Sequence, residues 1–190
     1  MALDITFTLT DEDLEHFQEI VDRAKMAMED GTEGSEIEKA AQKMIDEARK
    51  TEPPDFISSR LFKLETVINM VRDEEWRLND EERARIRGAL VYFTNPQDLI
   101  PDHIPGLGFL DDAIYVELIL RELKNEIDHY EEFCVFRSNE ERKRVENGED
   151  PQVGREEWLK DKRASLHSRM RRYRRRRMGG DVMSSWRFRW

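Results

Sequence analysis

The spacing of apolar residues changes from strand-like to helix-like near the start of this chain. Residues 3–9 alternate apolar and polar side chains, which predicts a short extended N-terminal arm. After them, apolar residues recur every three or four positions, as on one face of an α-helix. This spacing predicts helices near residues 11–30, 35–52, 55–71, 80–94 and 110–137. We therefore expect an all-α bundle of about five core helices with an N-terminal arm.

Residues that favour caps and turns separate these helices. Ser35 and Glu38 form a capping-box pattern, Pro53-Pro54 ends the second helix, and Asn79 caps the fourth. The expected core positions of the second and third helices are Ile37, Ala41, Met44 and Ala48, then Ile57, Leu61, Leu64, Ile68 and Val71. The longest and most regular apolar stripe belongs to the fifth helix, and comprises Ala113, Val116, Leu120, Leu123, Ile127, Tyr130 and Cys134. Its length predicts a central helix.

Polar residues and a change in charge divide the chain near its C-terminal end. Residues 138–154 are polar and contain Asn147-Gly148 and Pro151, which predicts a linker between a helical domain (1–137) and a tail (155–190). The tail carries thirteen Lys or Arg and four Asp or Glu, a balance of +9. Because the whole chain is −10, residues 1–154 are left at −19. The two parts should therefore meet different partners, or each other.

Composition indicates a cytoplasmic protein. Charged residues are 39% of the chain, against about 25% in ordinary globular domains. No apolar run reaches the roughly 18 residues of a transmembrane helix, and the first residues do not resemble a signal peptide. One cysteine excludes an internal disulfide. These features predict a protein without a transmembrane segment, either free in the cytoplasm or peripheral at the inner face of the membrane.

The connection between the fourth and fifth helices is unusual in both length and composition. Residues 95–113 hold three prolines, two glycines and four aspartates among large apolar side chains. Connections in compact helical domains usually have about 2–8 residues, so one of about 15 indicates a specific purpose. The prolines fix φ, and the apolar residues argue against a solvated linker. An ordered loop is predicted.

The same segment resembles a known signature. Asp98-Leu99-Ile100-Pro101-Asp102, followed by Ile104-Pro105, Gly108 and Asp111-Asp112, is similar to the motif of the YkvA-like proteins, a bacterial family of unknown function (DUF1232). The resemblance covers about residues 60–125 and is strongest over 92–120. It implies a small helical protein, sometimes membrane-associated, without an established enzyme activity. Members often have a more apolar segment after the aspartate pair, which Glu117, Arg121 and Glu122 interrupt here. This argues against insertion of the hairpin into lipid.

The carboxylates of this loop have two interpretations. The candidate residues are Asp98, Pro101, Asp102, Pro105, Gly108, Asp111 and Asp112. In the structural interpretation, Asp111 and Asp112 lie in the first helical turn, where the helix dipole favours negative charge. The carboxylates of Asp98 and Asp102 would accept hydrogen bonds from backbone N–H groups of the turn, or pair with Arg83 or Arg87. In the alternative, the carboxylates bind Mg²⁺ or Ca²⁺, and any enzyme activity would use this loop.

Other candidate chemistry is weak, and the sequence predicts neither a catalytic residue nor a cofactor. Glu126 and His129 form the Glu-x-x-His pattern of di-iron bundles, but His129 falls nearly opposite Ile127 on the helix. His103 adjoins Asp102 without an identifiable nucleophile. Cys134 continues the apolar stripe and is expected to be a small core residue.

The tail contains the strongest indication of function. Seven of nine consecutive residues are arginines: Arg169, Arg171, Arg172, Arg174, Arg175, Arg176 and Arg177. Trp186, Phe188 and Trp190 then alternate with arginines. One interpretation is that the tail is merely solvated, or that the acidic residues 1–154 neutralise its charge, and in either case it would bind no ligand. Otherwise Tyr173 within the arginine block favours nucleic acid, and the terminal aromatic residues favour lipid.

We therefore predict a non-enzymatic binding or adaptor protein. Its arginine-rich tail would engage RNA or a ribonucleoprotein, with an anionic membrane surface as the alternative. A homo-oligomer is compatible with the extended arm, because a lone strand needs a partner.

Overall fold

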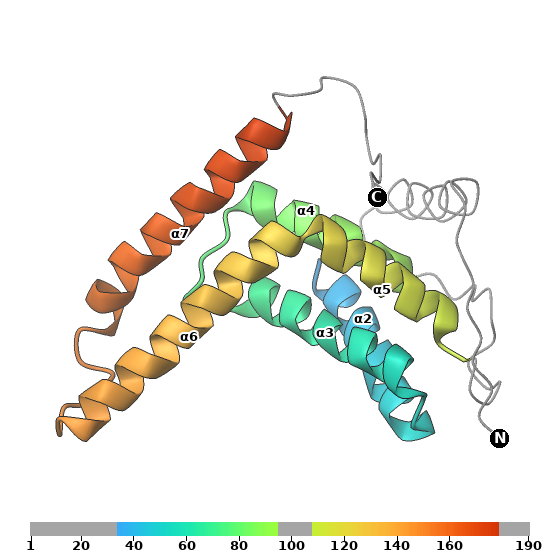
Figure 1. Cartoon of the computed structure of the whole chain (residues 1–190), viewed down its shortest axis with the longest axis horizontal. Helices are drawn as coiled ribbons and strands as arrows, with labels where there is room; N and C mark the ends of the chain where they lie inside the picture. The colour runs from blue at the N-terminus through green and yellow to red at the C-terminus, as the bar shows by residue number, and fades with distance from the viewer. Residues whose placement is uncertain (1–33, 95–107, 179–190) are drawn as a thin grey trace. The chain divides into compact units, whose positions relative to one another are not determined.

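The computed structural model describes residues 34–94 and 108–178 of the chain (Figure 1). These residues form six α-helices and one short 3-10 helix, and they contain no strand. The all-α prediction is therefore confirmed. The predicted extended arm, the helix near 11–30 and the centre of the aspartate-proline loop lie outside the described residues.

The chain divides into two compact units, which we describe separately. Unit 1 comprises residues 1–71 and 78–121. Unit 2 comprises residues 72–77 and 122–190. The short segment 72–77 therefore belongs with the C-terminal helices, although it lies in sequence between two helices of unit 1.

Unit 1 contains α2 (Gly34–Thr51), most of α3 (Asp55–Arg72), α4 (Asp80–Leu90), the 3-10 helix η1 (Val91–Thr94) and most of α5 (Leu110–Glu122). The start of α4 follows the cap predicted at Asn79, but the capping box predicted at Ser35 and Glu38 is not present. Helix α2 begins at Gly34, before Ser35, and the Glu38 carboxylate pairs with Arg87. The Asn79 side chain accepts a hydrogen bond from the Glu82 backbone N–H at 2.8 Å, and the Glu82 carboxylate accepts the Asn79 N–H at 3.2 Å. This capping box satisfies two backbone donors at the start of α4.

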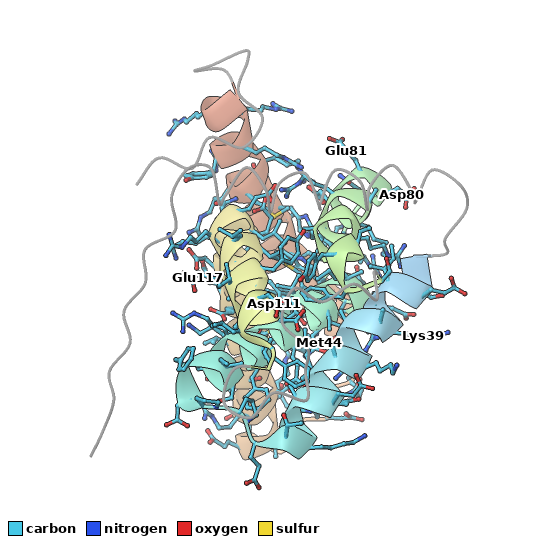
Figure 2. All side chains as sticks on the ribbon, turned by 90° about the vertical axis from the view of Figure 1, so that its right-hand side faces the viewer. Lys39, Met44, Asp80, Glu81, Asp111 and Glu117 are labelled. Atoms are coloured by element: carbon cyan, nitrogen blue, oxygen red, sulfur yellow. The ribbon has the colours of Figure 1, made fainter. Side chains whose placement is uncertain are left out.

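The predicted core positions of α3 are all buried, and those of α2 are buried with one exception. Ile37, Ala41 and Ala48 are fully buried as expected. The remaining core position of α2 is Ile45, whereas Met44 is only half-buried (Figure 2). Both residues are apolar and adjacent, so the sequence pattern alone did not distinguish them.

Unit 2 is built around α6 (Lys124–Glu146) and α7 (Arg155–Met178). The single helix predicted over 110–137 is instead two helices, α5 and α6, interrupted at Leu123. Leu123 has φ −86° and ψ 8°, outside regular helical geometry. No glycine or proline marks this interruption, and the apolar spacing continues through it. Periodicity therefore did not reveal the break.

The predicted linker over 138–154 is shorter than expected, because residues 138–146 continue α6. Gly148, with φ +74°, ends the helix. Its N–H donates to the Val145 carbonyl at 3.0 Å, and the Glu149 N–H donates to the Arg144 carbonyl at 2.9 Å. These two bonds form a Schellman motif. The end of α6 is polar because it is largely exposed, not because it is unstructured.

Helices α6 and α7 run antiparallel to each other (Figure 1). The buried face of α7 comprises Leu159, Arg163, Leu166, His167 and Met170. On α6, Ile127, Tyr130 and Phe133 are buried. Residues 155–170 therefore form part of the folded core of unit 2.

Candidate functional site

Helix α7 changes character at Met170. Up to this residue, one face of the helix is buried in unit 2. The Asn125 side-chain amide, in the first turn of α6, donates to the Met170 carbonyl at 3.4 Å. Since α6 begins at Lys124, residues 171–178 of α7 continue past the end of the helix that supports it.

Basic residues in the first half of α7 are held by carboxylates of unit 2. The Arg155 guanidinium pairs with Glu75 and, at 2.6 Å, with Glu141. Arg163 is 7% exposed, pairs with Glu156 at 2.5 Å and donates to the Glu75 carbonyl at 2.9 Å. The hydrogen bond from Arg155, followed by that from Arg137, lowers the pKa of Glu75 below its ordinary value. These arginines stabilise the fold, and their guanidinium groups are already paired with groups of unit 2.

Glu132 of α6 holds two further cations of α7. Its carboxylate lies 2.7 Å from Lys162 Nζ and 2.9 Å from Arg169 Nη1. The hydrogen bond from Lys162 and the charges of Lys162 and Arg169 lower the pKa of Glu132. Arg169, one of the predicted polyanion-binding residues, is thus ion-paired within unit 2.

The second half of α7 contains three arginines that differ from those of the first half in exposure and in ion pairing. Arg172, Arg175 and Arg176 are exposed and form no ion pair with another described residue. Their spacing of three and four residues places them on one helix face. Arg171 and Arg174 are half-buried and have interactions, and the side chain of Arg177 lies outside the described part. Tyr173 is 53% exposed beside this face.

The terminal aromatic residues of the tail, Trp186, Phe188 and Trp190, lie outside the described residues. Their role in stacking or membrane contact stays a prediction.

The aspartate-proline loop is only partly described. Asp98, Pro101, Asp102 and Pro105 lie outside the described residues. Gly108 is buried in a turn, and the first backbone hydrogen bond of α5 runs from the Ala113 N–H to the Phe109 carbonyl at 2.9 Å.

Asp111 and Asp112 lie in the first turn of α5, as predicted, but they are more deeply buried than a simple capping role requires. Their exposed fractions are 2% and 4%, and both have interactions within the structure. Figure 2 places Asp111 among the helices of unit 1, whereas Glu117 lies on the outer side of α5. A cation site in this loop stays a prediction.

The two arginines suggested as partners for the loop aspartates have other partners. Arg87 Nη2 lies 2.8 Å from the buried carboxylate of Glu38. Arg83 Nη1 donates to the Val71 carbonyl at 3.3 Å. Both interactions hold helices of unit 1 together.

Two of the remaining candidates, His129 and Cys134, lie on α6, whereas His103 lies outside the described residues. His129 Nδ1 lies 2.6 Å from the Asn125 carbonyl of the preceding turn and so donates to it. Cys134 is half-buried rather than fully buried, and burial raises the pKa of its thiol. Within residues 34–94 and 108–178, no group of three His, Cys, Asp or Glu side chains is arranged to hold a metal ion.

Sequence reasoning missed the centre of unit 2, Trp76. Its side chain is fully buried, with ring centroids 4.2 Å from His167 and 5.1 Å from Phe133. His167 Nε2 lies 2.8 Å from the Trp76 carbonyl. The Asp73 carboxylate accepts the Trp76 N–H at 3.1 Å, which fixes the turn. A tryptophan within a polar segment, three residues after an aspartate, was the available signal.

Comparisons with known proteins agree with the signature. The family described as "Protein of unknown function (DUF1232)" matches residues 82–118, which contain most of α4, all of η1 and the first part of α5. The "Uncharacterized membrane protein YkvA" of Bacillus subtilis (strain 168) is 39% identical over 74 residues, which are 36% of this chain and 68% of that protein. No solved structure matches the chain.

Helix α7 lies outside the residues that the family matches. In the part of the chain that the structure describes, no helix is both long and apolar enough to cross a membrane. The aspartate-proline signature, the family match and the similarity to YkvA agree, and the chain belongs to the DUF1232 family of YkvA-like proteins.

Proposed function

We propose that this protein binds RNA through the C-terminal half of α7. The observation that carries the proposal is the exposed face formed by Arg172, Arg175 and Arg176, which has no acidic partner among the described residues. A guanidinium group binds a phosphate through two parallel hydrogen bonds and also stacks on bases. Exposed Tyr173 adds an aromatic surface for stacking.

The anchoring of α7 in unit 2 supports this proposal. A free segment with so many arginines would resist helix formation, because like charges three or four residues apart repel. Here the buried residues Leu166 and Met170 hold the helix immediately before the arginine block. The arginines are therefore presented on a formed helix, and RNA binding would require less ordering of the chain.

An anionic membrane surface is the second candidate, favoured by the name of the Bacillus relative, which is called a membrane protein. A helix that lies in a membrane interface needs an apolar face. In α7, Leu159, Leu166 and Met170 are already buried within unit 2. Membrane binding would instead combine the arginines with Trp186, Phe188 and Trp190.

Fluorescence anisotropy with labelled RNA oligonucleotides tests the proposal on the full chain. The variant R172Q/R175Q/R176Q should weaken binding at least about tenfold, because three phosphate contacts are lost. The slope of log K against log salt should become shallower by about 2 for single-stranded RNA. The matched control is K39Q/K50Q/K63Q, which removes three positive charges from exposed positions of α2 and α3. Equal binding by the two variants would contradict the proposal.

Co-sedimentation with vesicles of phosphatidylglycerol and phosphatidylcholine tests the second candidate. A requirement for phosphatidylglycerol, together with loss of binding on replacing Trp186, Phe188 and Trp190 by serine, would support membrane attachment. If the full chain bound these vesicles but no RNA, the membrane would replace RNA as the ligand.

A further inference from the structure

Basic residues on α7 form a longer surface than the exposed arginines alone. Lys162, Arg169, Arg172 and Arg176 are separated by seven, three and four residues, which places all four on one side of the helix. We call these four residues the basic stripe. The helical rise between its ends is about 21 Å, roughly four turns of helix.

The two ends of the basic stripe differ in their surroundings. Arg172 and Arg176 are exposed and form no ion pair with a described residue. Lys162 and Arg169 both contact Glu132 of α6, at 2.7 Å and 2.9 Å. One carboxylate of the supporting helix thus occupies the first half of the stripe.

We infer that the RNA-binding surface extends along the whole basic stripe, and that Glu132 competes with the RNA backbone for its first half. The inference rests on the proposed function, since it adds a longer contact and an internal competitor to the same site. In the free protein, the Glu132 carboxylate pairs with both Lys162 and Arg169. When RNA binds, its phosphates replace the carboxylate on Arg169 and Lys162.

The exposure of the Glu132 contacts makes this exchange feasible. The side chains of Arg169 and Glu132 are 48% and 38% exposed, so an incoming phosphate can reach both. Ion pairs of this exposure contribute at most about 1 kcal/mol, and a phosphate offers arginine the same paired acceptor geometry as a carboxylate. The contrast with Arg163 is clear, because Arg163 is 7% exposed and its partners are within unit 2.

The inference is tested with Glu132→Gln in the full chain, by anisotropy with single-stranded RNA over a series of salt concentrations. Loss of the competing carboxylate should tighten binding about three- to tenfold at low salt, because Lys162 and Arg169 no longer exchange an ion pair for each phosphate contact. The matched control is Glu131→Gln, an exposed neighbour on α6 with the same change in charge and no contact with Arg169. The double variant Glu132→Gln/Arg169→Gln should lose most of the gain. Thermal unfolding of each variant verifies that unit 2 stays folded.

The outcomes separate this inference from the proposed function. Suppose that Glu132→Gln and Glu131→Gln bind RNA equally while R172Q/R175Q/R176Q binds weakly. The RNA-binding surface is then limited to the residues after Met170, so the inference is wrong, although the proposed function stands. If R172Q/R175Q/R176Q binds RNA as well as the wild type, both are wrong. If Glu132→Gln increases binding to phosphatidylglycerol vesicles and leaves RNA binding unchanged, RNA is the wrong partner.

Discussion

The two halves of α7 carry similar numbers of basic residues, five in residues 155–170 and six in residues 171–178, but these residues have opposite environments. Before Met170, arginines such as Arg155 and Arg163 meet carboxylates and carbonyls of unit 2. After Met170, Arg172, Arg175 and Arg176 face solvent. The reach of α6 explains the difference, because its first turn meets α7 at Met170. An arginine count therefore does not measure binding capacity; the position of each arginine relative to its neighbouring acids does.

The comparison predicts that stability resides in the first half of α7 and ligand binding in the second. Arg169 marks the boundary, since it is ion-paired with Glu132 yet half exposed. Variants that change stability without changing RNA binding, or the reverse, would support this division. Variants that change both together would contradict it.

Trp76→Ala should have the largest effect on stability. The fully buried indole contacts His167 and Phe133, so its removal leaves a large cavity in unit 2. We expect a loss of about 3–5 kcal/mol in the free energy of unfolding. Hydrogen exchange should increase in α6 and in residues 155–170 of α7. Phe56→Ala is the control, because this aromatic ring on α3 is 49% exposed. A similar loss in both variants would contradict the structural role of the first half.

Glu75→Gln should have an intermediate effect that depends on pH. The neighbouring Arg155, followed by Arg137, lowers the pKa of Glu75 in the folded protein. A lowered pKa stabilises the fold above the unfolded glutamate pKa of about 4.3, and the stabilisation is lost as the pH falls through the folded value. Because Glu75 is one-third exposed, we expect a cost of only about 1–2 kcal/mol at pH 7.

Urea unfolding at pH 3 to 7 measures this dependence. The difference between wild type and Glu75→Gln should be constant above about pH 5 and shrink below about pH 4. Glu74→Gln, at the exposed adjacent position, should show a smaller difference throughout. A gap between wild type and Glu75→Gln that does not change with pH would exclude the ion pairs as its source.

Features that depend on near neighbours in sequence were predicted well. The capping box at Asn79 and the buried stripe of α3 are local patterns, and both are present. The turn at Asn147-Gly148 was also located correctly, although α6 continues through the polar residues before it. An exposed helix end needs no apolar face, so polarity was a poor indicator of a linker there.

Features that depend on distant contacts were not predicted. Trp76 meets His167 across 91 residues, and Glu132 meets Arg169 across 37. The interruption at Leu123 separates helices of different units, and the apolar spacing is the same on both sides of it. In the candidate site, the sequence identified the arginines but not which of them are paired, since that depends on the packing of α6 against α7.

The variant R172Q/R175Q/R176Q should have the smallest effect on stability. Glutamine and arginine have similar helix propensity, so the helix itself is preserved. Arg172 lies three residues from Arg175 and four from Arg176, and removing each of these repulsive pairs should contribute roughly 0.2–0.5 kcal/mol. We therefore expect unchanged or slightly increased stability in urea. Arg163→Gln, one substitution in the buried half, should cost about 1–3 kcal/mol because the buried guanidinium no longer donates to the Glu75 carbonyl, and Glu156 keeps only its pair with Arg77. If the triple variant destabilised unit 2 as much as Arg163→Gln, the arginines beyond Met170 would be structural, and the weaker RNA binding of that variant would no longer identify a ligand-binding face.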